Sequence, residues 1–139
     1  VLIDMHKLSE NYKAFVGIDP QDITSATTVD GTGVDCLEMN DDVMAVMQLG
    51  TMTGTHTCDV KLQESDTLGS GYTDITDAAF TQADQGDGNT IAVVGAKRTK
   101  QFVRATVTTA GTVTANEISV SLLVRAGEGA ADLNSTDPA

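Results

Sequence analysis

The side chains of this sequence that could take part in metal or nucleophilic chemistry are its two cysteines and two histidines. His56 and Cys58 stand two residues apart, so a strand would place both on one face, where Cys36 or His6 could complete a zinc shell. The spacing does not resemble paired zinc knuckles, and the sequence contains no G-x-S-x-G motif for a serine nucleophile. We therefore expect both cysteines to be buried thiols, with a cross-strand disulfide or a metal site as alternatives.

Carboxylates are abundant but form no recognisable site. In the loop DQGDGN, the side chains of Asp84, Asp87 and Asn89 could supply the oxygen ligands that calcium prefers. The register differs from that of an EF-hand loop, because Gly95 occupies the twelfth position, where a bidentate Glu should stand. The sequence also lacks a glycine-rich phosphate loop with its lysine. We therefore predict a solvated loop, no cofactor and no enzymatic activity.

Arg104 is a candidate for contacts with protein surfaces. It lies within QFVRATVT, so it would project from the outer face of a strand with its stem over a neighbour such as Phe102. Alternatively, it would sit at a subunit interface and pair with a carboxylate of another copy, such as Asp74 or Asp77. The sequence alone leaves both interpretations open.

The only basic run in the chain, KRTK, contains Lys97, Arg98 and Lys100. It is either a solvated loop before a strand or a contact with an acidic patch on a partner. Elsewhere acidic residues dominate, because 20 Asp and Glu oppose 8 Lys and Arg and give a formal net charge of −12. Such a surface disfavours nucleic-acid binding, which depends on phosphate contacts. No apolar run reaches the roughly 18 residues that a membrane-spanning helix needs, so we expect no membrane partner.

The elements that must position these residues are strands. In CDVKLQES, which begins at Cys58, apolar and polar residues alternate with the period of two that is typical of a half-buried strand. The run VMAVMQLG is almost continuously apolar and indicates a strand that is buried on both faces. Predicted strands cover residues 58–65, 101–108 and 117–124, the apolar run 43–50, and three shorter segments at 14–18, 34–40 and 91–94.

Turn residues separate these strands. The sequence LGSG predicts a loose hairpin, and Gly111 in TTAGTV predicts a hairpin that makes 101–108 and 113–124 antiparallel neighbours. Helical turns are expected only near Asp4–Tyr12 and Asp77–Ala83. Because only 4% of the residues are aromatic and Trp is absent, the composition suits a thin sandwich better than a deep ligand cavity.

The expected fold class is all-β, with a single antiparallel β-sandwich or jelly-roll-like domain. A chain of 139 residues most simply forms one domain. Residues 16–125 would form the sandwich, and residues 1–15 an extended N-terminal segment or arm. Residues 126–139 would form a flexible C-terminal tail, because hydrophobic periodicity ends after Arg125.

Two segments of the sequence resemble a known family. They are VKLQESDTLGSGYTDITDAAF and KQFVRATVTTAGTVTANEISVSLLV, and a Gly/Asp loop lies between them. This order resembles small virion proteins of tailed bacteriophages, the head decoration or cement proteins, over residues 58–124. The residues that carry the resemblance are Leu62, Gln63, Ser65, Asp66, Tyr72, Thr73, Asp74, Ile75, Ala79, Phe80, Phe102, Val103, Arg104, Ala105, Gly111 and Thr112.

The resemblance implies a structural role in a virion. A protein of this family is a β-sandwich on the outside of an expanded icosahedral capsid, made in the host bacterial cytoplasm. It binds the major capsid protein, often as a homo-trimer at three-fold positions. Alternatives are a carbohydrate-binding or fibre-type virion module, which usually presents aromatic platforms, and a head-completion or tail ring protein. The predicted capsid or subunit interface comprises Lys97, Arg98, Lys100, Phe102, Arg104, Asp74 and Tyr72.

Overall fold

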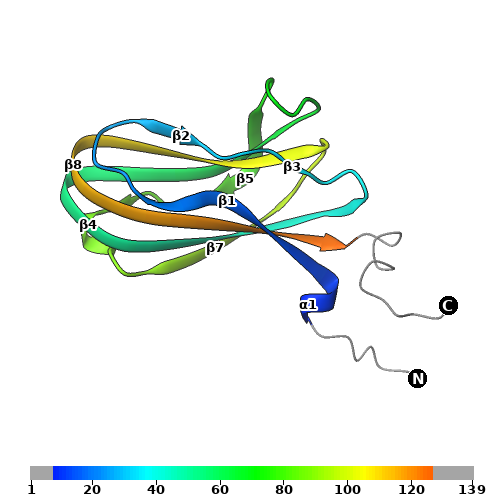
Figure 1. The fold of residues 1–139 in the computed structure, drawn as a ribbon, viewed down its shortest axis with the longest axis horizontal. Helices are drawn as coiled ribbons and strands as arrows, with labels where there is room; N and C mark the ends of the chain where they lie inside the picture. Colours follow the sequence, from blue (N-terminus) through cyan, green and yellow to red (C-terminus); the bar gives the residue numbers. More distant parts are fainter. Residues whose placement is uncertain (1–7, 127–139) are drawn as a thin grey trace.

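The computed structural model describes residues 8–126 as an antiparallel β structure (Figure 1). Every strand pairing in this part of the chain is antiparallel, which confirms the predicted all-β class. Residues 1–7 of the predicted N-terminal arm and residues 127–139 of the predicted C-terminal tail lie outside the described residues. The rest of the predicted arm, residues 8–15, forms a short helix and the start of a strand that pairs within the sheet. The elements are α1 (Leu8–Asn11), β1 (Tyr12–Asp22), β2 (Thr28–Asp30), β3 (Val34–Asp35), β4 (Met39–Ser65), β5 (Thr73–Ala79), β6 (Ala83–Asp84), the 3-10 helix η1 (Gln85–Asp87), β7 (Ile91–Lys97) and β8 (Phe102–Ala126).

Two unusually long strands, β4 and β8, organise the fold. They contain 27 and 25 residues and pair from Met39 opposite Ala126 to Ser65 opposite Phe102. Figure 1 shows that this two-stranded ribbon bends over on itself, so that each strand contributes one half to each of two layers. The predicted strands 43–50 and 58–65 are therefore parts of one strand.

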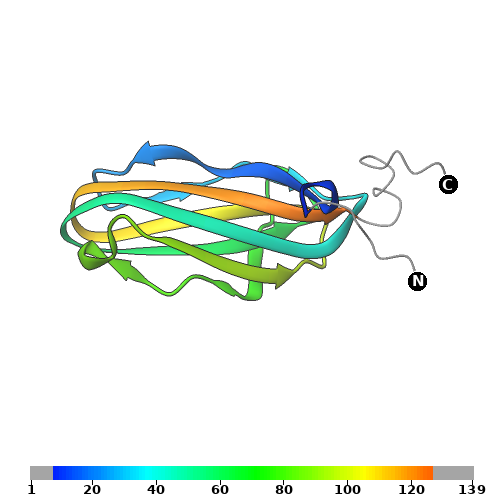
Figure 2. The ribbon, with the colours of Figure 1, turned by 90° about the horizontal axis from the view of Figure 1, so that it is seen from below.

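The two layers have different edge strands. Sheet 1 consists of β1, the second half of β8, the first half of β4 and β7, which lie side by side in Figure 2. Sheet 2 consists of β2 and β3, the first half of β8, the second half of β4, and β5 with β6. Both sheets direct alternate side chains into one core, which is the arrangement of a jelly-roll-like sandwich.

The ribbon bends at two glycines, Gly54 of β4 and Gly111 of β8. Both have positive φ angles, 109° and 102°, in a region that residues with a side chain rarely adopt. A Cβ at Gly54 would lie 2.3 Å from the carbonyl oxygen of Thr112, and a Cβ at Gly111 would lie 2.6 Å from that of Thr55. The predicted hairpin at Gly111 is wrong, because the strand continues through this glycine and bends from one sheet to the other instead of reversing.

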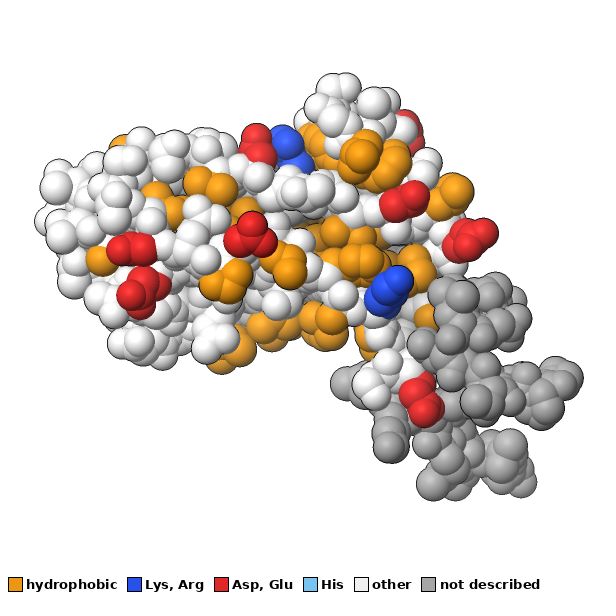
Figure 3. All heavy atoms as spheres, in the orientation of Figure 1, with side chains coloured by type: hydrophobic (Ala, Val, Ile, Leu, Met, Phe, Trp, Pro, Cys, Tyr) orange, Lys and Arg blue, Asp and Glu red, His pale blue; other side chains and the backbone are white. Residues whose placement is uncertain are grey.

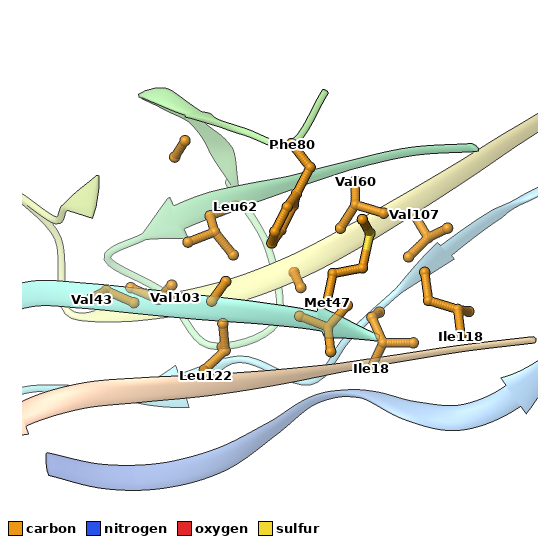
Figure 4. Close-up of a cluster of buried hydrophobic side chains, with 14 of the residues drawn as sticks. Ile18, Val43, Met47, Val60, Leu62, Phe80, Val103, Val107, Ile118 and Leu122 are labelled. Atoms are coloured by element: carbon orange, nitrogen blue, oxygen red, sulfur yellow. The ribbon is translucent and has the colours of Figure 1, made fainter. Parts of the chain in front are cut away.

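The core lies between the two sheets and is almost entirely aliphatic. Figure 4 shows Leu62 and Val107 of sheet 2 pointing toward Met47 and Leu122 of sheet 1. Phe80 is the only aromatic residue among the buried hydrophobic residues of the described chain. The buried hydrophobic residues of the long strands are Val43, Ala45, Met47, Leu49, Met52, Cys58, Val60, Leu62, Val103, Ala105, Val107, Val113, Ile118, Val120, Leu122 and Val124.

Local structure differs from the sequence expectation between β5 and β7. The helical turn predicted at Asp77–Ala83 is wrong, because β5 continues to Ala79, residues 80–82 form no helix, and β6 begins at Ala83. The side chain of Phe80 is buried, and its backbone N–H donates to the carbonyl oxygen of Val60 at 2.9 Å. Burial of Phe80 and this bond to β4 therefore override the local helical preference. The other helical expectation, near Asp4–Tyr12, is met by α1 within the described residues.

Candidate interaction surfaces

The outer face of sheet 2 carries a row of polar side chains that are bonded to one another. Arg104 donates to Oε1 of Gln63 from Nε at 3.0 Å and from Nη2 at 2.8 Å. Its Nη1 also lies 3.5 Å from Oδ2 of Asp30. On the other side, Gln63 and Lys61 each donate to Asp74 at 2.8 Å. Arg104 and Asp74 therefore belong to one intramolecular row and are joined through Gln63.

Tyr72 closes this row at one end. The guanidinium of Arg104 lies 4.1 Å from the centroid of the Tyr72 ring, and the Tyr72 hydroxyl donates to the carbonyl oxygen of Leu68 at 2.7 Å. Gly33 makes room for this ring, because a Cβ there would lie 2.0 Å from the hydroxyl oxygen. Burial raises the pKa of Tyr72, and the charge of Arg104 opposes that shift. Phe102 lies two residues before Arg104 on β8 and therefore on the same face of the strand. We call Leu68, Tyr72, Phe102 and Arg104 the Tyr72 patch.

Hydrogen bonds within the row favour the charged form of Asp74. A hydrogen bond from Lys61 and a second one from Gln63 lower the pKa of Asp74 below its usual value. The side chain of Arg104 is only 21% exposed, so its position is fixed by the side chains around it. The Tyr72 patch therefore presents a preordered arginine and aromatic ring, together with the half-exposed side chain of Leu68.

The basic run is divided between structural and exposed positions. Arg98 donates to the backbone carbonyl oxygens of Cys36, Met39, Asn40 and Lys100 at 2.5 to 3.2 Å. These bonds tie the segment after β3 to the connection between β7 and β8. The five donors of Arg98 are thus largely committed inside the chain.

Lys97 and Lys100 occupy different surroundings from Arg98. Lys97 forms ion pairs with Asp42 at 2.8 Å and with Asp41 at 3.7 Å. The backbone N–H of Lys100 donates to the carboxylate of Glu64 at 3.2 Å. The sequence predicted these lysines as interface residues, and that prediction remains open.

Glu64 is a structural carboxylate that the sequence analysis did not identify. It is buried, and it accepts hydrogen bonds from the N–H and the hydroxyl of Thr99 at 2.6 and 2.7 Å. Burial opposes its charged form, but the bonds from Thr99 and Lys100 outweigh that effect, so the pKa of Glu64 lies below its ordinary value. The sequence did contain a signal for this role, because Glu64 occupies an inward position in the alternating strand that begins at Cys58.

The residues considered for metal chemistry are mostly buried inside the sandwich. His56 Nε2 lies 2.9 Å from Oδ1 of Asn116, and both side chains are buried. Cys36 and Cys58 are free buried thiols, as predicted, and burial raises the pKa of each to about 11. His6 lies outside the described residues. Between residues 8 and 126 no three His, Cys, Asp or Glu side chains form a metal-binding group.

The acidic loop caps its own backbone. Asp84 accepts a bond from the N–H of Gly86 at 2.7 Å, and the N–H of Asp84 donates to Asp87 at 2.9 Å. These two bonds form a capping box around the 3-10 helix η1. Asp84 and Asp87 therefore stabilise the backbone of the loop itself through these bonds.

The outer face of sheet 1 differs from that of sheet 2, because its centre is apolar. Val16, Ile91 and Val93 are 58%, 64% and 58% exposed, although all three lie on strands. Figure 3 has the orientation of Figure 1 and shows hydrophobic side chains along the lower margin, where sheet 1 lies in Figure 1. We call the outward residues Ala14, Val16, Met44, Val46, Ile91, Val93 and Leu123 the apolar face.

A shallow depression of about 640 Å³ adjoins the apolar face near the bend. Its lining contains no aromatic side chain, which removes the platform on which sugar-binding sites usually depend. In the described part of the chain, no helix is both long and apolar enough to cross a membrane. The lining residues are Pro20, Gln21, Asp22, Gln48, Leu49, Gly50, Asn89, Thr90, Ile91, Glu117, Ile118 and Ser119.

Comparison with known proteins identifies the fold and no family. No protein-family model and no curated protein sequence matches this chain. Among solved structures, the PBSX exported protein XepA matches 84% of the chain with a TM-score of 0.61 and 15% identity. A structure of the infectious bursal disease virus Gx strain matches 85% with a TM-score of 0.56 and 14% identity. The chain spans 38% and 32% of the length of these two proteins.

A third similar structure is the SPBc2 prophage-derived protein YomS, with a TM-score of 0.49, 14% identity, and coverage of 84% of this chain and 94% of that one. At these identities the likeness concerns the fold. This chain therefore has a jelly-roll-like fold that resembles the folds of the PBSX exported protein XepA and of the infectious bursal disease virus structure.

Proposed function

We propose that this protein is a non-enzymatic structural protein of a phage virion, which binds the outside of an expanded capsid and stabilises it. The observation that carries the proposal is the Tyr72 patch, in which Arg104 is held against Tyr72 beside the exposed Leu68. Tyr and Arg are enriched at protein interfaces and often dominate their binding energy. The likeness of the fold to virus structures is consistent with this role.

The arrangement of the patch favours binding to a preformed surface. Arg104 is already bonded to Gln63, so little side-chain entropy is lost when a partner covers it. Leu68 lies within a turn that is closed by a bridge between Thr67 and Ser70. An anchor of this kind binds a rigid protein lattice at low entropic cost, and the major capsid protein is the partner that we propose.

The stabilising mechanism is differential affinity. A protein that binds the expanded lattice, and not the unexpanded or dissociated one, shifts the equilibrium toward the expanded state. At a free concentration of about 100 times Kd, each site contributes about 2.7 kcal/mol to the favoured state. Several copies on one capsid add these contributions, and avidity increases further when one assembly engages several capsid subunits. On the capsid, three copies around each three-fold position remain part of this proposal, which makes no claim about the oligomeric state of the free protein.

The role of the patch is tested by co-sedimentation with expanded, undecorated capsids encoded by the same genome. We expect Leu68→Asp to weaken binding at least tenfold, because a charge replaces the exposed apolar side chain of the patch. Thr57→Asp is the matched control, since it places the same charge elsewhere on the outer face of sheet 2. Equal binding of both variants would contradict the assignment. If the wild-type protein binds glycans and not capsids, the carbohydrate-binding alternative replaces the proposal.

A further inference from the structure

The apolar face is unusual for the outer face of a sandwich. Outward residues stand in rows across the four strands, and one row joins Ala14, Leu123, Met44 and Gly95. The next row joins Val16, Ser121, Val46 and Val93. Neither row contains a charged side chain, although 20% of all residues in the chain are charged.

The area of the apolar face is comparable to that of interaction sites on other proteins. With strands about 4.8 Å apart and about 3.3 Å of rise per residue, the uncharged part of sheet 1 measures about 20 Å by 19 Å. The largest apolar patch on a typical monomer measures about 300–600 Å² and often has a function, and this uncharged area of about 400 Å² lies within that range. The sequence run 43–50 has the composition of a strand buried on both faces, yet Met44 and Val46 are only partly covered within one chain.

Charges line one end of the apolar face in an alternating order. Asp42 on β4 pairs with Lys97 on β7 at 2.8 Å and with Arg125 on β8 at 3.3 Å. Tyr12 on β1 stands opposite Arg125 in the register of sheet 1. The row therefore reads aromatic, positive, negative, positive from β1 to β7.

We propose that the apolar face binds a second copy of this chain, related by a two-fold axis that runs along the strands between β4 and β8. This rotation places β4 over β8 of the second copy and β1 over β7, while each row stays at its own level. Face-to-face sheets pack in this aligned manner, within about 30° of one another. A two-fold contact requires a self-complementary surface, and the rows of sheet 1 meet that requirement.

The charged row is complementary under this rotation. Asp42 lies over Arg125 of the second copy, and Arg125 lies over its Asp42. Lys97 lies over Tyr12 of the second copy, where an ammonium can contact an aromatic ring. Two acidic residues do not meet at this end, so a chain with a net charge of −12 can associate here without placing like charges in contact.

The apolar rows are complementary as well. In one row Val46 lies over Ser121 of the second copy, so that a large side chain meets a small one. In the other row Ala14 lies over Gly95, while Met44 and Leu123 meet at the centre. A basic partner protein would instead need acidic side chains on this face, and the rows between Asp42 and Gln48 contain none.

The expected dimer is reversible. A face of about 400 Å² is about half of the roughly 800 Å² that each partner contributes to a standard interface. The Tyr72 patch lies on sheet 2 and stays accessible in both copies, so the dimer presents two such patches. The inference does not depend on capsid binding, and its tests use different residues from those of the Tyr72 patch.

The first test measures the mass of the purified protein by sedimentation equilibrium up to about 0.1 mM, where a dimer with micromolar Kd is largely formed. We expect a dimer that Val46→Lys weakens at least tenfold. Thr57→Lys is the matched control, because it places the same charge on the same strand but on the outer face of sheet 2. A wild-type monomer, a trimer, or a dimer that Val46→Lys leaves unchanged would overturn the proposal.

The second test uses charge exchange and does not depend on the stability of one variant. Asp42→Arg alone and Arg125→Asp alone should each fail to form homodimers, because like charges then meet across the axis. Mixed together, the two variants should form a heterodimer, since both cross-axis pairs become complementary. Native mass spectrometry distinguishes the species by mass. The absence of preferential heterodimers in the mixture would overturn the two-fold arrangement.

Discussion

The guanidinium of Arg104 lies 4.1 Å from the ring centroid of Tyr72, and Gln63 fixes it there through two hydrogen bonds. Tyr72 itself is held by its bond to the carbonyl oxygen of Leu68. The two side chains thus form one rigid unit at the rim of sheet 2. The pairing of β4 with β8 therefore sets the position of the two side chains that we propose to bind a capsid.

Arg104→Lys should weaken this unit without changing its charge. A lysine loses the planar fork that bonds to Gln63 and stacks on Tyr72, so the free energy of unfolding should fall by about 0.5–1 kcal/mol. Affinity for expanded capsids should fall as well. Urea denaturation and co-sedimentation measure the two effects, and Lys61→Arg is the control. Unchanged values for Arg104→Lys would show that the stack has no role.

Glu64→Gln should alter the pH dependence of stability. The pKa of Glu64 in the folded protein lies below its ordinary value of 4.5, so its charged form stabilises the fold above that value. This contribution is lost as the pH falls through the folded pKa. At neutral pH the variant should be less stable by about 1–3 kcal/mol, since Thr99 loses a charged acceptor.

The pH titration of stability separates this effect from general destabilisation. Between about pH 5 and about pH 3, the free energy of unfolding should fall less steeply for Glu64→Gln than for the wild type. Glu38→Gln changes an exposed side chain and is the matched control. Parallel curves for Glu64→Gln and the wild type would contradict the structural role of this carboxylate.

Alanine at either glycine of the bend should destabilise the sandwich. Gly54 and Gly111 have positive φ angles, and a Cβ at each would collide with a backbone carbonyl of the facing strand. We expect each substitution to cost about 1–3 kcal/mol or more in unfolding free energy. Gly69→Ala is the control, because no atom lies within 4 Å of a Cβ at that position. Thermal unfolding that ranks Gly69→Ala with the other two would be evidence against a strained bend.

The two cysteines should react with thiol reagents only when the chain unfolds. Cys36 and Cys58 are buried, and burial raises their pKa to about 11, so little reactive thiolate exists near neutral pH. Labelling with an aromatic disulfide should be slow in buffer and fast in urea. The labelling rate should therefore track the unfolded population. Rapid labelling of the native protein would contradict the burial of these thiols.

Much of the strand structure could be predicted because the inward residues alternate strictly. The alternation around Leu62 and around Leu122 identified both halves of the core. The bend at Gly111 could not be predicted, since a glycine between threonines is equally compatible with a hairpin and with a curved strand. Only the pairing of Gly111 with His56 on β4 distinguishes the two. That pairing is a long-range contact, and local sequence does not encode it.

The candidate surfaces were predictable in part. The resemblance singled out Tyr72 and Arg104, but it did not indicate that Gln63 joins Arg104 to Asp74. Arg98 was grouped with its neighbours by charge, whereas the structure directs its donors to backbone carbonyls that lie near it only in the folded chain. The apolar face was missed because its residues come from four strands that are distant in sequence. The continuous apolar run at 43–50 was the one sequence signal of this face, because it is typical of a strand that is covered on both sides.

The most direct test of the proposed function compares binding of the wild-type protein to expanded, undecorated capsids and to unexpanded procapsids from the same genome. We expect saturable co-sedimentation with expanded capsids alone, at a copy number commensurate with the symmetry of the lattice. Bound protein should also raise the temperature at which those capsids disrupt. Equal binding to both forms, or binding to neither, would contradict the claim that this protein stabilises the expanded capsid.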